Sequence, residues 1–220
     1  MENSIFITGT DTGVGKTIVT GLLLKFLRCQ KINAVTQKWV QTGNIKISED
    51  IEKHFKIAGT HADKVHKNYS DMAPYIFSLA ASPHLAAQEE NSLISKKKIK
   101  ESFLRLKKEF DIVIVEGTGG FLVPINSEYL LADLVQEVKM PVLIVVGNKL
   151  GAINHTLLTV EAIKKRGLKI LGIVFNRIEN ELSDKIALDN VKIIKDITGE
   201  NVFGEIKYSD NIEKLYEYFI

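Results

Sequence analysis

A glycine-rich loop between a short apolar segment and a helical segment constrains the fold more than any other feature of the sequence. Residues 4–7 have the pattern of a buried strand, and residues 8–17, TGTDTGVGKT, follow directly. In such a loop Gly13 and Gly15 let the backbone curl around oxyanions, and Lys16 reaches the outer phosphates of a nucleoside triphosphate. Thr17 can offer its hydroxyl to a magnesium ion. A glycine-rich turn that only caps a helix is the alternative, but the complete strand, loop and helix favour phosphate binding.

The spacing of the loop departs from the usual pattern. The first glycine is expected at position 10, but the chain has Thr10 there and Gly9 one residue earlier. We therefore interpret the loop as a stretched variant of the phosphate-binding loop.

The composition is that of an ordinary globular protein. Of the 220 residues, 45% are hydrophobic and 25% are charged, so we expect one domain over residues 1–220. The net charge of +2 gives no reason to expect nucleic acid or a membrane as the main partner. We interpret the lysines at 96–98 and 100 as a solvated helix face. The single cysteine, Cys29, and the absence of a recognisable secretion signal or membrane-spanning run predict a cytoplasmic location.

Apolar segments alternate with helical segments along the chain. The predicted strands cover residues 4–8, 34–37, 112–115, 142–146, 170–175 and 202–203, and the predicted helices cover residues 16–29, 98–110, 152–165 and 183–198. A further helix is expected to begin near residues 48–50. This alternation predicts an α/β fold with a mostly parallel sheet that helices cover on both faces. Ligands of such sheets bind at the carboxyl ends of the strands, so the residues after each apolar segment are candidate site residues.

Charged residues follow or approach two of these strand ends. Lys38 follows the second predicted strand, where its ammonium group either faces a transferred phosphate or an anionic substrate, or is simply exposed. Asp50 either caps its helix or points toward a magnesium ion. Glu116 is the stronger signal, because it follows an aliphatic run and precedes a flexible turn, as a magnesium-organising carboxylate does in nucleotide enzymes. Asp111 starts this strand at its far end and receives no role.

Two later segments bear on the nucleotide and on an acidic ligand. Asn148 and Lys149 begin a sequence similar to the guanine-reading motif of GTPases, but Gly151 replaces the aspartate that would contact guanine, so a GTPase is disfavoured. The same segment starts a helix, whose backbone N–H groups from Gly151 to Ile153 are available to a carboxylate. Asn176 follows another strand, where it either hydrogen-bonds a purine edge or forms a turn.

The segment between residues 43 and 80 is the least explained by its sequence. His54, His61 and His66 lie in it without the spacing of metal ligands, so we interpret them as scattered solvent-exposed or core histidines. Residues 77–83 are expected to form part of a substrate wall.

Taken together, the motifs resemble those of the dethiobiotin synthetases, ligases of biotin biosynthesis in the P-loop NTPase superfamily. The resemblance covers most of the chain and rests on residues 8–17, on Lys38 with Thr42, and on residues 82–84, 116–120, 123–124 and 149–155. It implies that 7,8-diaminononanoate, CO2 derived from bicarbonate, and ATP give the cyclic urea dethiobiotin, ADP and phosphate. An amine traps CO2 as a carbamate, the carbamate attacks the γ-phosphorus, and the second amine closes the ring on the mixed anhydride.

The resemblance also implies roles for individual residues. It implies that Lys38, Lys16 and Thr12 are catalytic. It implies that ATP and magnesium contact Gly13, Val14, Gly15, Lys16, Thr17, Ile18, Asp50, Glu116, Gly117, Thr118, Gly119, Asn176 and Arg177, with Thr17, Asp50 and Glu116 around the metal. It implies that the substrate contacts Thr42, Gly151, Ala152, Ile153 and Asn154. In this family the helix start at 151–154 comes from a neighbouring subunit and binds the substrate carboxylate, so a homodimer is implied.

The chain departs from the family pattern in three places. Gly13 replaces a glutamate that the family often has, Thr42 replaces a serine, and residues 204–210 lack the usual proline-containing stretch that binds the base. We therefore predict that triphosphate and magnesium contacts dominate nucleotide affinity and that selection among bases is loose.

Two alternative functions remain open at this point. A partition-type ATPase usually has a second lysine early in the loop, where this chain has Thr10 and Asp11. A non-catalytic nucleotide-binding regulator is the other alternative.

Overall fold

The computed structural model describes residues 3–61, 67–177 and 183–207. The strands are β1 (Ser4–Gly9), β2 (Ala34–Lys38), β3 (Gln41–Thr42), β4 (Ile76–Phe77), β5 (Ile112–Gly120), β6 (Val142–Gly147), β7 (Ile170–Asn176) and β8 (Val202–Ile206). The helices are α1 (Lys16–Cys29), α2 (Glu49–Ile57), α3 (Tyr69–Met72), α4 (Pro83–Glu89), α5 (Lys96–Glu109), α6 (Leu131–Glu137), α7 (Ala152–Lys165) and α8 (Asp184–Thr198).

A six-stranded parallel sheet forms the centre of the fold, in the order β2-β5-β1-β6-β7-β8. The predicted α/β fold with a mostly parallel sheet is confirmed. β3 and β4 form a separate parallel pair. In the large sheet β5 continues past the predicted end at residue 115, because its glycine-rich segment still pairs with β1, up to Gly9 opposite Gly120. The carboxyl ends of β1, β2 and β5 therefore lie side by side.

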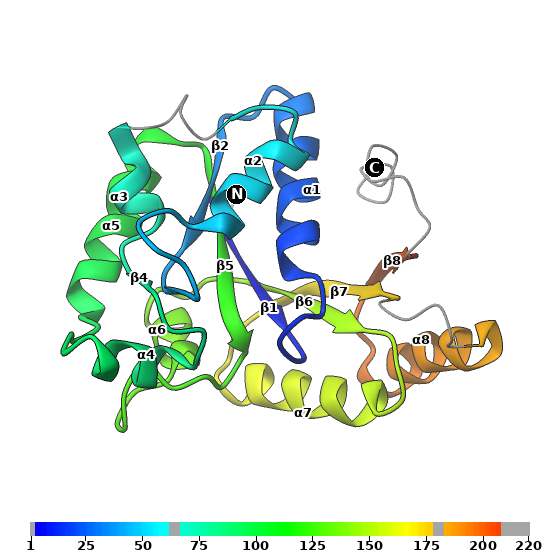
Figure 1. Ribbon diagram of the computed structural model, residues 1–220. Helices are drawn as coiled ribbons and strands as arrows, with labels where there is room; N and C mark the ends of the chain where they lie inside the picture. Colours follow the sequence, from blue (N-terminus) through cyan, green and yellow to red (C-terminus); the bar gives the residue numbers. More distant parts are fainter. Residues whose placement is uncertain (1–2, 62–66, 178–182, 208–220) are drawn as a thin grey trace.

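Helices cover both faces of the large sheet (Figure 1). The chain steps from β1 past β5 to β2 in one direction, and its later steps between strands of this sheet run in the opposite direction. Because crossovers between parallel strands are right-handed, α1 lies on the opposite face from α7 and α8. In Figure 1, α1 and α2 lie above the strands, and α7 and α8 lie below them. With both faces covered, strands such as β6 are buried over their whole length.

Several boundaries differ from the sequence prediction. α5 begins at Lys96 rather than residue 98, and the Ser95 hydroxyl accepts the backbone N–H of Lys98 at 3.3 Å, which caps the helix there. The sequence does not predict α3, α4, α6 or the β3–β4 pair. These elements are only two to seven residues long, which is too short for a periodic pattern to show.

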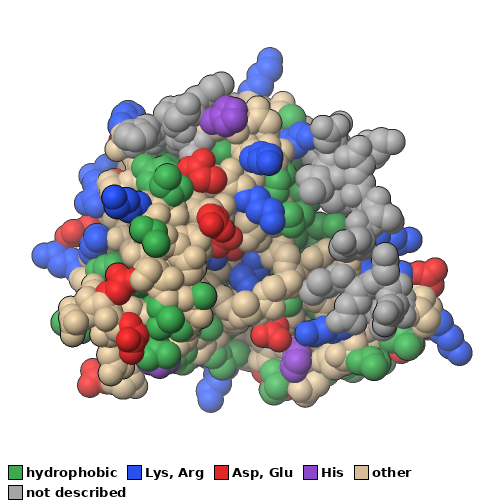
Figure 2. Space-filling model, in the orientation of Figure 1, with side chains coloured by type: hydrophobic (Ala, Val, Ile, Leu, Met, Phe, Trp, Pro, Cys, Tyr) green, Lys and Arg blue, Asp and Glu red, His purple; other side chains and the backbone are tan. Residues whose placement is uncertain are grey.

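The surface carries both signs of charge. Lys and Arg side chains are interspersed with Asp and Glu on the face that Figure 2 shows. Within the predicted solvated face of α5, Lys96 and Lys100 pair with Glu137 of α6 at 3.2 and 3.0 Å. The hydroxyl of Tyr129 donates to the same carboxylate at 2.6 Å. These lysines therefore link two helices rather than form an unpaired basic patch.

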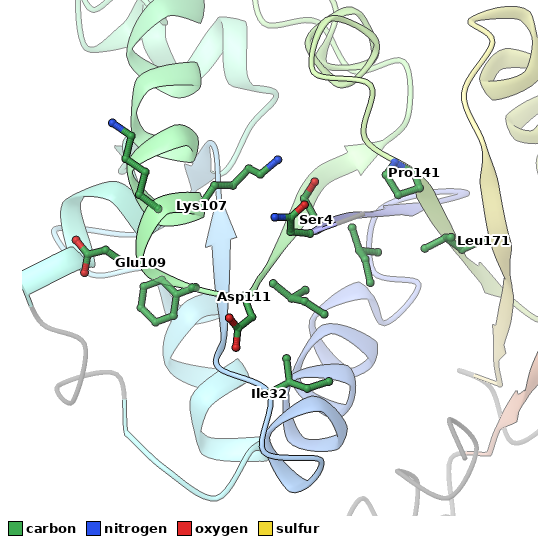
Figure 3. Close-up of a pocket in the computed structure, with 12 residues that line it drawn as sticks. Ser4, Ile32, Lys107, Glu109, Asp111, Pro141 and Leu171 are labelled. Atoms are coloured by element: carbon green, nitrogen blue, oxygen red, sulfur yellow. The ribbon is translucent and has the colours of Figure 1, made fainter. Parts of the chain in front are cut away.

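A cavity of about 640 Å³ opens at the amino ends of the strands (Figure 3). Ser4, Asp111 and Pro141 are among the residues that line it. Asp111 accepts the backbone N–H of Asn33 at 3.1 Å, which ties the start of β5 to the turn before β2. The cavity lies at the edge of the sheet opposite the glycine-rich loop, and ligands of parallel sheets bind at the other, carboxyl edge.

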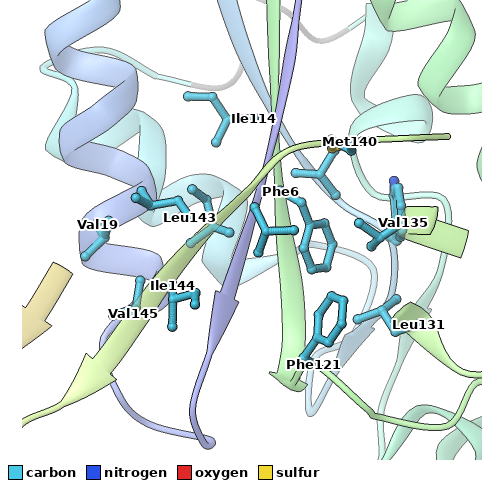
Figure 4. Packing of buried hydrophobic residues seen from close by; sticks show 14 of the residues in the cluster. Phe6, Val19, Ile114, Phe121, Leu131, Val135, Met140, Leu143, Ile144 and Val145 are labelled. Carbon is cyan, nitrogen blue, oxygen red and sulfur yellow. The ribbon is translucent and has the colours of Figure 1, made fainter. Parts of the chain in front are cut away.

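The core packs between the sheet and its helices (Figure 4). Phe6 of β1 and Phe121, just after β5, pack with Leu131 and Val135 of α6 and with Met140, and all five are buried. Burying each such side chain contributes about 1.5–3 kcal/mol. This packing fixes the strand ends that carry the candidate site.

Candidate active site

The glycine-rich loop joins β1 to α1 and is braced from two sides. Gly15 ends the loop with φ 96°, a left-handed conformation that favours glycine. The Asn176 side chain donates to the Val14 carbonyl at 2.9 Å, and a Cβ built on Gly15 would lie 2.1 Å from the same amide nitrogen. Lys16 reaches back along the loop and donates to the Asp11 carbonyl at 3.0 Å. The first N–H groups of α1 thus face the loop, as phosphate binding needs.

The early glycine of the stretched loop has a packing reason. A Cβ on Gly9 would lie 2.6 Å from the Val14 side chain and 3.0 Å from Lys16 Nζ. Gly9 therefore lets the loop fold down over the end of β1.

Three predicted metal ligands and Lys38 meet at the carboxyl edge of β2 and β5. The Thr17 hydroxyl lies 3.0 Å from Asp50 Oδ1 and 3.1 Å from Glu116 Oε1. Lys38 Nζ lies 2.8 Å from both Asp50 Oδ2 and Glu116 Oε1, and it also donates to the Gly117 carbonyl at 3.1 Å. β2 pairs with β5 so that Lys38 is directly opposite Glu116. The structure therefore brings these side chains, distant in sequence, into one cluster.

The charges of this cluster stabilise one another. Burial alone would lower the pKa of Lys38, but Glu116 and Asp50 outweigh it and raise that pKa. Burial alone would raise the pKa of Glu116, but Lys38 and His54 hold it well below its usual value. For Lys16, burial and the nearby charge of Lys38 lower the pKa to about 8, against the attraction of Glu116 and Asp50. A triphosphate would supply the anion that Lys16 lacks.

The oxygen atoms of the cluster fit a magnesium ion. Two carboxylates and a hydroxyl are ligands that magnesium accepts, and it usually completes its shell with water and phosphate oxygens. The Lys38 ammonium lies between the two carboxylates and pairs with both. Among the described residues no group of three or more His, Cys, Asp and Glu side chains is arranged to hold a metal ion.

His54 contacts the cluster, and the sequence interpretation missed this. Its ring is fully buried in α2, and Nε2 lies 2.5 Å from Glu116 Oε2. The available signal was the spacing, because Asp50 and His54 are four residues apart on one helix and so share a face. His61 is exposed. His66 lies outside the described residues.

The turn after Glu116 is held by the protein itself. A Cβ on Gly117 would lie 2.8 Å from the Phe6 ring, so glycine is needed there for packing. The Thr118 hydroxyl donates to the Val40 carbonyl. The Thr12 hydroxyl lies 3.5 Å from the position of a Cβ on Gly119, which has φ 67°. Thr12 and the turn therefore line the same space.

The predicted substrate residues lie in two separate places. Thr42 is in β3, beside β4. Gly151, with φ 86°, caps α7, and Ala152 is buried whereas Asn154 is exposed. In the hydrogen bonds and ion pairs of residues 3–61, 67–177 and 183–207, none links the start of α7 to the Lys38 cluster.

The side chains predicted to approach the base are already engaged within the chain. Arg177 pairs with Glu205 at 2.8 Å and also with Asp184. Asn148 donates to the same Glu205 carboxylate at 2.5 Å. Asn176 donates to the loop, as described above, and Ile18 is half-buried in α1. Residues 208–210 of the atypical segment lie outside the described residues.

The chain is similar to known proteins over most of its length. A family model described as an AAA domain matches residues 3–215. The ATP-dependent dethiobiotin synthetase BioD of Clostridium perfringens is 38% identical over 97% of this chain and 94% of its own length. Two further relatives carry that description. BioD of Chlorobaculum tepidum is 40% identical over 93% of this chain and 84% of its own length. BioD 2 of Haemophilus influenzae is 42% identical over 80% of this chain and 92% of its own length.

The chain belongs to the ATP-dependent dethiobiotin synthetase family. Solved structures with a similar fold are more distant in sequence. The MinC:MinD cell division protein complex of Aquifex aeolicus aligns with a TM-score of 0.59 and 17% identity over 98% of this chain and 84% of that one. A ParA family ATPase of Chlorobium tepidum aligns with a TM-score of 0.58 and 14% identity over 99% of this chain and 90% of that one. At these low identities, the similarity shows only that this dethiobiotin synthetase family member shares the fold of the two solved structures.

None of the helices in the described part of the chain is long and apolar enough to cross a membrane.

Proposed function

We propose that this chain is an ATP-dependent dethiobiotin synthetase, which closes the ureido ring of dethiobiotin from 7,8-diaminononanoate and CO2. The observation that carries the proposal is the cluster of the buried Lys38 and Glu116 with the half-buried Asp50, beside the glycine-rich loop in a member of this family. The cluster offers a cation and carboxylates at the point where a transferred phosphoryl group would lie.

The reaction forms two C–N bonds at one carbon atom. One substrate amine adds to CO2 and loses a proton, which gives a carbamate. A carbamate oxygen attacks the γ-phosphorus of ATP, the bond to the bridging oxygen breaks, and ADP leaves. The second amine attacks the carbonyl carbon of the mixed anhydride, and phosphate leaves with the cyclic urea. Carbamate and triphosphate are both anionic, so the site must mainly position them and stabilise charge.

Two lysines meet this demand in our proposal. Lys16 binds the outer phosphates from the loop, and Lys38 faces the γ-phosphate and the carbamate from β2. Thr17, Asp50 and Glu116 hold magnesium, which would neutralise charge on the phosphates when bound. The Thr17 hydroxyl lies about 3 Å from both carboxylates, which supports this set.

On the substrate side, we assign Thr12 and Thr42 to hydrogen bonds with the carbamate or the amines. We assign the substrate carboxylate to the start of α7 in a partner subunit, at Gly151, Ala152, Ile153 and Asn154. A helix start with free N–H groups suits a carboxylate. Within the described residues no hydrogen bond or ion pair links this helix start to the Lys38 cluster, which favours a homodimer.

We further propose that one domain carries the whole site and that the base is weakly selected. Asn176 and Arg177 are engaged by the protein, which leaves the phosphates as the main point of recognition. Turnover with ATP, GTP and CTP should therefore differ by less than about tenfold, which corresponds to about 1.4 kcal/mol. A strong preference for one base would contradict this. The exposed thiol of Cys29 suits a reducing compartment, and we propose the cytoplasm.

The decisive experiment is an assay with 7,8-diaminononanoate, bicarbonate, ATP and magnesium. We expect mass spectrometry to detect the cyclic urea in an amount equal to that of the released phosphate. When bicarbonate is removed, neither product should form above the background level. Phosphate release that depends on DNA or vesicles rather than on the diamine would indicate a partition-type ATPase. Nucleotide binding without phosphate release would indicate a regulator.

A further inference from the structure

The two oxygens of the Glu116 carboxylate have separate partners. Oε1 lies 3.1 Å from the Thr17 hydroxyl and 2.8 Å from Lys38 Nζ. Oε2 lies 2.5 Å from His54 Nε2, on the side of α2. The side chain is buried, so water does not provide other partners. The two sets of contacts together fix the rotation of the carboxylate about its last bond.

His54 donates this hydrogen bond through Nε2. The oxygen of an ionised carboxylate only accepts, so the hydrogen lies on Nε2 whatever the charge of the ring. The other ring nitrogen, Nδ1, is buried without a hydrogen-bond partner among the described residues. Leaving such a group unpaired costs about 1–3 kcal/mol. An apolar side chain would fill this place in α2 without that cost, so packing alone does not explain a histidine here.

The helix geometry links His54 to the same site. Asp50 lies one turn earlier on α2 and contacts Thr17 and Lys38, whereas His54 contacts Glu116 from the next turn. Ile51 and Phe55 of α2 are buried and anchor the helix. One helix therefore presents one carboxylate to the cluster and holds the other in place.

We propose that His54 is a positioning residue of the metal site: it holds Oε2 of Glu116 so that Oε1 faces Thr17 and the bound divalent cation. The inference rests on the proposed magnesium site. Residues that hold a metal ligand through its second oxygen commonly change metal affinity 10- to 100-fold when they are replaced. His54 acts through Glu116 and touches neither ATP nor substrate in this proposal.

A matched pair of variants tests the proposal. His54→Gln keeps an N–H donor near the position of Nε2, and His54→Met has almost the same length and shape without a donor. His54→Asn serves as a second variant without the bond, because its amide is too short to reach Oε2. The affinity for Mn²⁺ is measured by electron paramagnetic resonance, with a non-hydrolysable ATP analogue bound to each variant. Melting temperatures and nucleotide binding in EDTA control for folding and for the loop.

We expect His54→Gln to keep Mn²⁺ affinity within about threefold of the parent, and His54→Met and His54→Asn to lose about 10- to 100-fold. Nucleotide binding in EDTA should not differ among them. Equal Mn²⁺ affinity in the Gln, Met and Asn variants, or a loss in Gln as large as in Met, would overturn the proposal. If either donor-free variant, His54→Met or His54→Asn, does not fold, the other one gives the same comparison with His54→Gln.

Failure of the proposed function would look different. A parent protein that bound no Mn²⁺ with the ATP analogue, or that formed no cyclic urea, would contradict the proposed site as a whole. A parent that did both, with no difference between Gln and Met, would contradict only the role of His54.

Discussion

Lys38 is a buried lysine whose charge is retained because two carboxylates surround it. Removing an ammonium group from water carries a penalty of several kcal/mol, and only close, well-oriented partners repay it. Glu116 is also a buried charge with close partners, because Lys38 contacts one carboxylate oxygen and His54 contacts the other. Each of these charges is tolerated because the others are present. Because the charges depend on one another, an added cation or an added anion would change the electrostatic free energy of the whole cluster.

A double-mutant cycle at these two positions tests that mutual dependence. Lys38→Met leaves Glu116 buried without its main cation, so we expect the free energy of unfolding to fall by about 3 kcal/mol. Lys38→Met with Glu116→Gln removes both charges, and we expect at least half of that loss to be recovered. Urea denaturation measures both effects. Ring closure should fall by about 100-fold or more in both proteins. A double variant less stable than Lys38→Met alone would contradict this account.

Gly15 tests the conformation of the loop. In Gly15→Ala the new methyl group meets φ 96° and the Asn176 amide, which must move and give up its bond to Val14. We expect a loss of about 2–3 kcal/mol in stability and of about tenfold or more in nucleotide affinity. Gly167→Ala is the matched control, because Gly167 has φ 65° with nothing within 4 Å of a Cβ. It should lose only about 1 kcal/mol, with nucleotide affinity unchanged, as measured by calorimetry.

At the scale of elements, long amphipathic helices and buried strands were predictable and short connections were not. Helices at residues 16–29 and 152–165 have the predicted bounds, because apolar spacing and flanking glycines mark them. β5 runs on to Gly120, since a strand can continue through glycines when a neighbouring strand pairs with them. α6 and the β3–β4 pair depend on tertiary packing that no local pattern records.

The contact between α5 and α6 predicts an acid-sensitive part of the stability. Hydrogen bonds from Tyr129 and Lys100 lower the pKa of Glu137 to about 2, from 4.5. A depressed carboxyl pKa stabilises the fold above pH 4.5, and this stabilisation is lost as the pH falls toward 2. The groups are exposed, so solvent screening limits the effect to about 0.5–1 kcal/mol, or about 1–4 °C in melting temperature.

Glu137→Gln should therefore lower the melting temperature at pH 7 and narrow its difference from the parent between pH 5 and pH 3. Thermal melts at low and high salt measure this, and salt should reduce the difference at pH 7. Glu161→Gln is the control, because Glu161 forms no ion pair within the described residues. A constant difference between parent and Glu137→Gln over the whole pH range would contradict the assignment.

At the scale of the molecule, the site is assembled from the glycine-rich loop and from α1, β2, α2 and β5, which come from different parts of the sequence. The strand-end rule was enough to group Lys38, Glu116 and the loop, because parallel strands end at one edge. It did not reach His54, because the rule concerns strand ends and His54 lies in a helix, where only its four-residue spacing from Asp50 pointed to the site. The roles of Thr42 and of residues 151–154 stay predictions, and that of residues 151–154 depends on the proposed second subunit.

The proposed homodimer predicts an interface that a single charge would disrupt. Leu122 and Leu158 are exposed and line one small hollow beside α7, together with His155 and Thr10 of the loop. If the partner covers this face, Leu158→Glu places a charge in the interface and separates the dimer. We expect monomers by light scattering, nucleotide binding close to that of the parent, and ring closure reduced by about 100-fold or more because the carboxylate site is then missing. Leu104→Glu, at an equally exposed leucine of α5, should leave the dimer intact. A fully active Leu158→Glu monomer would show that one chain holds the whole site.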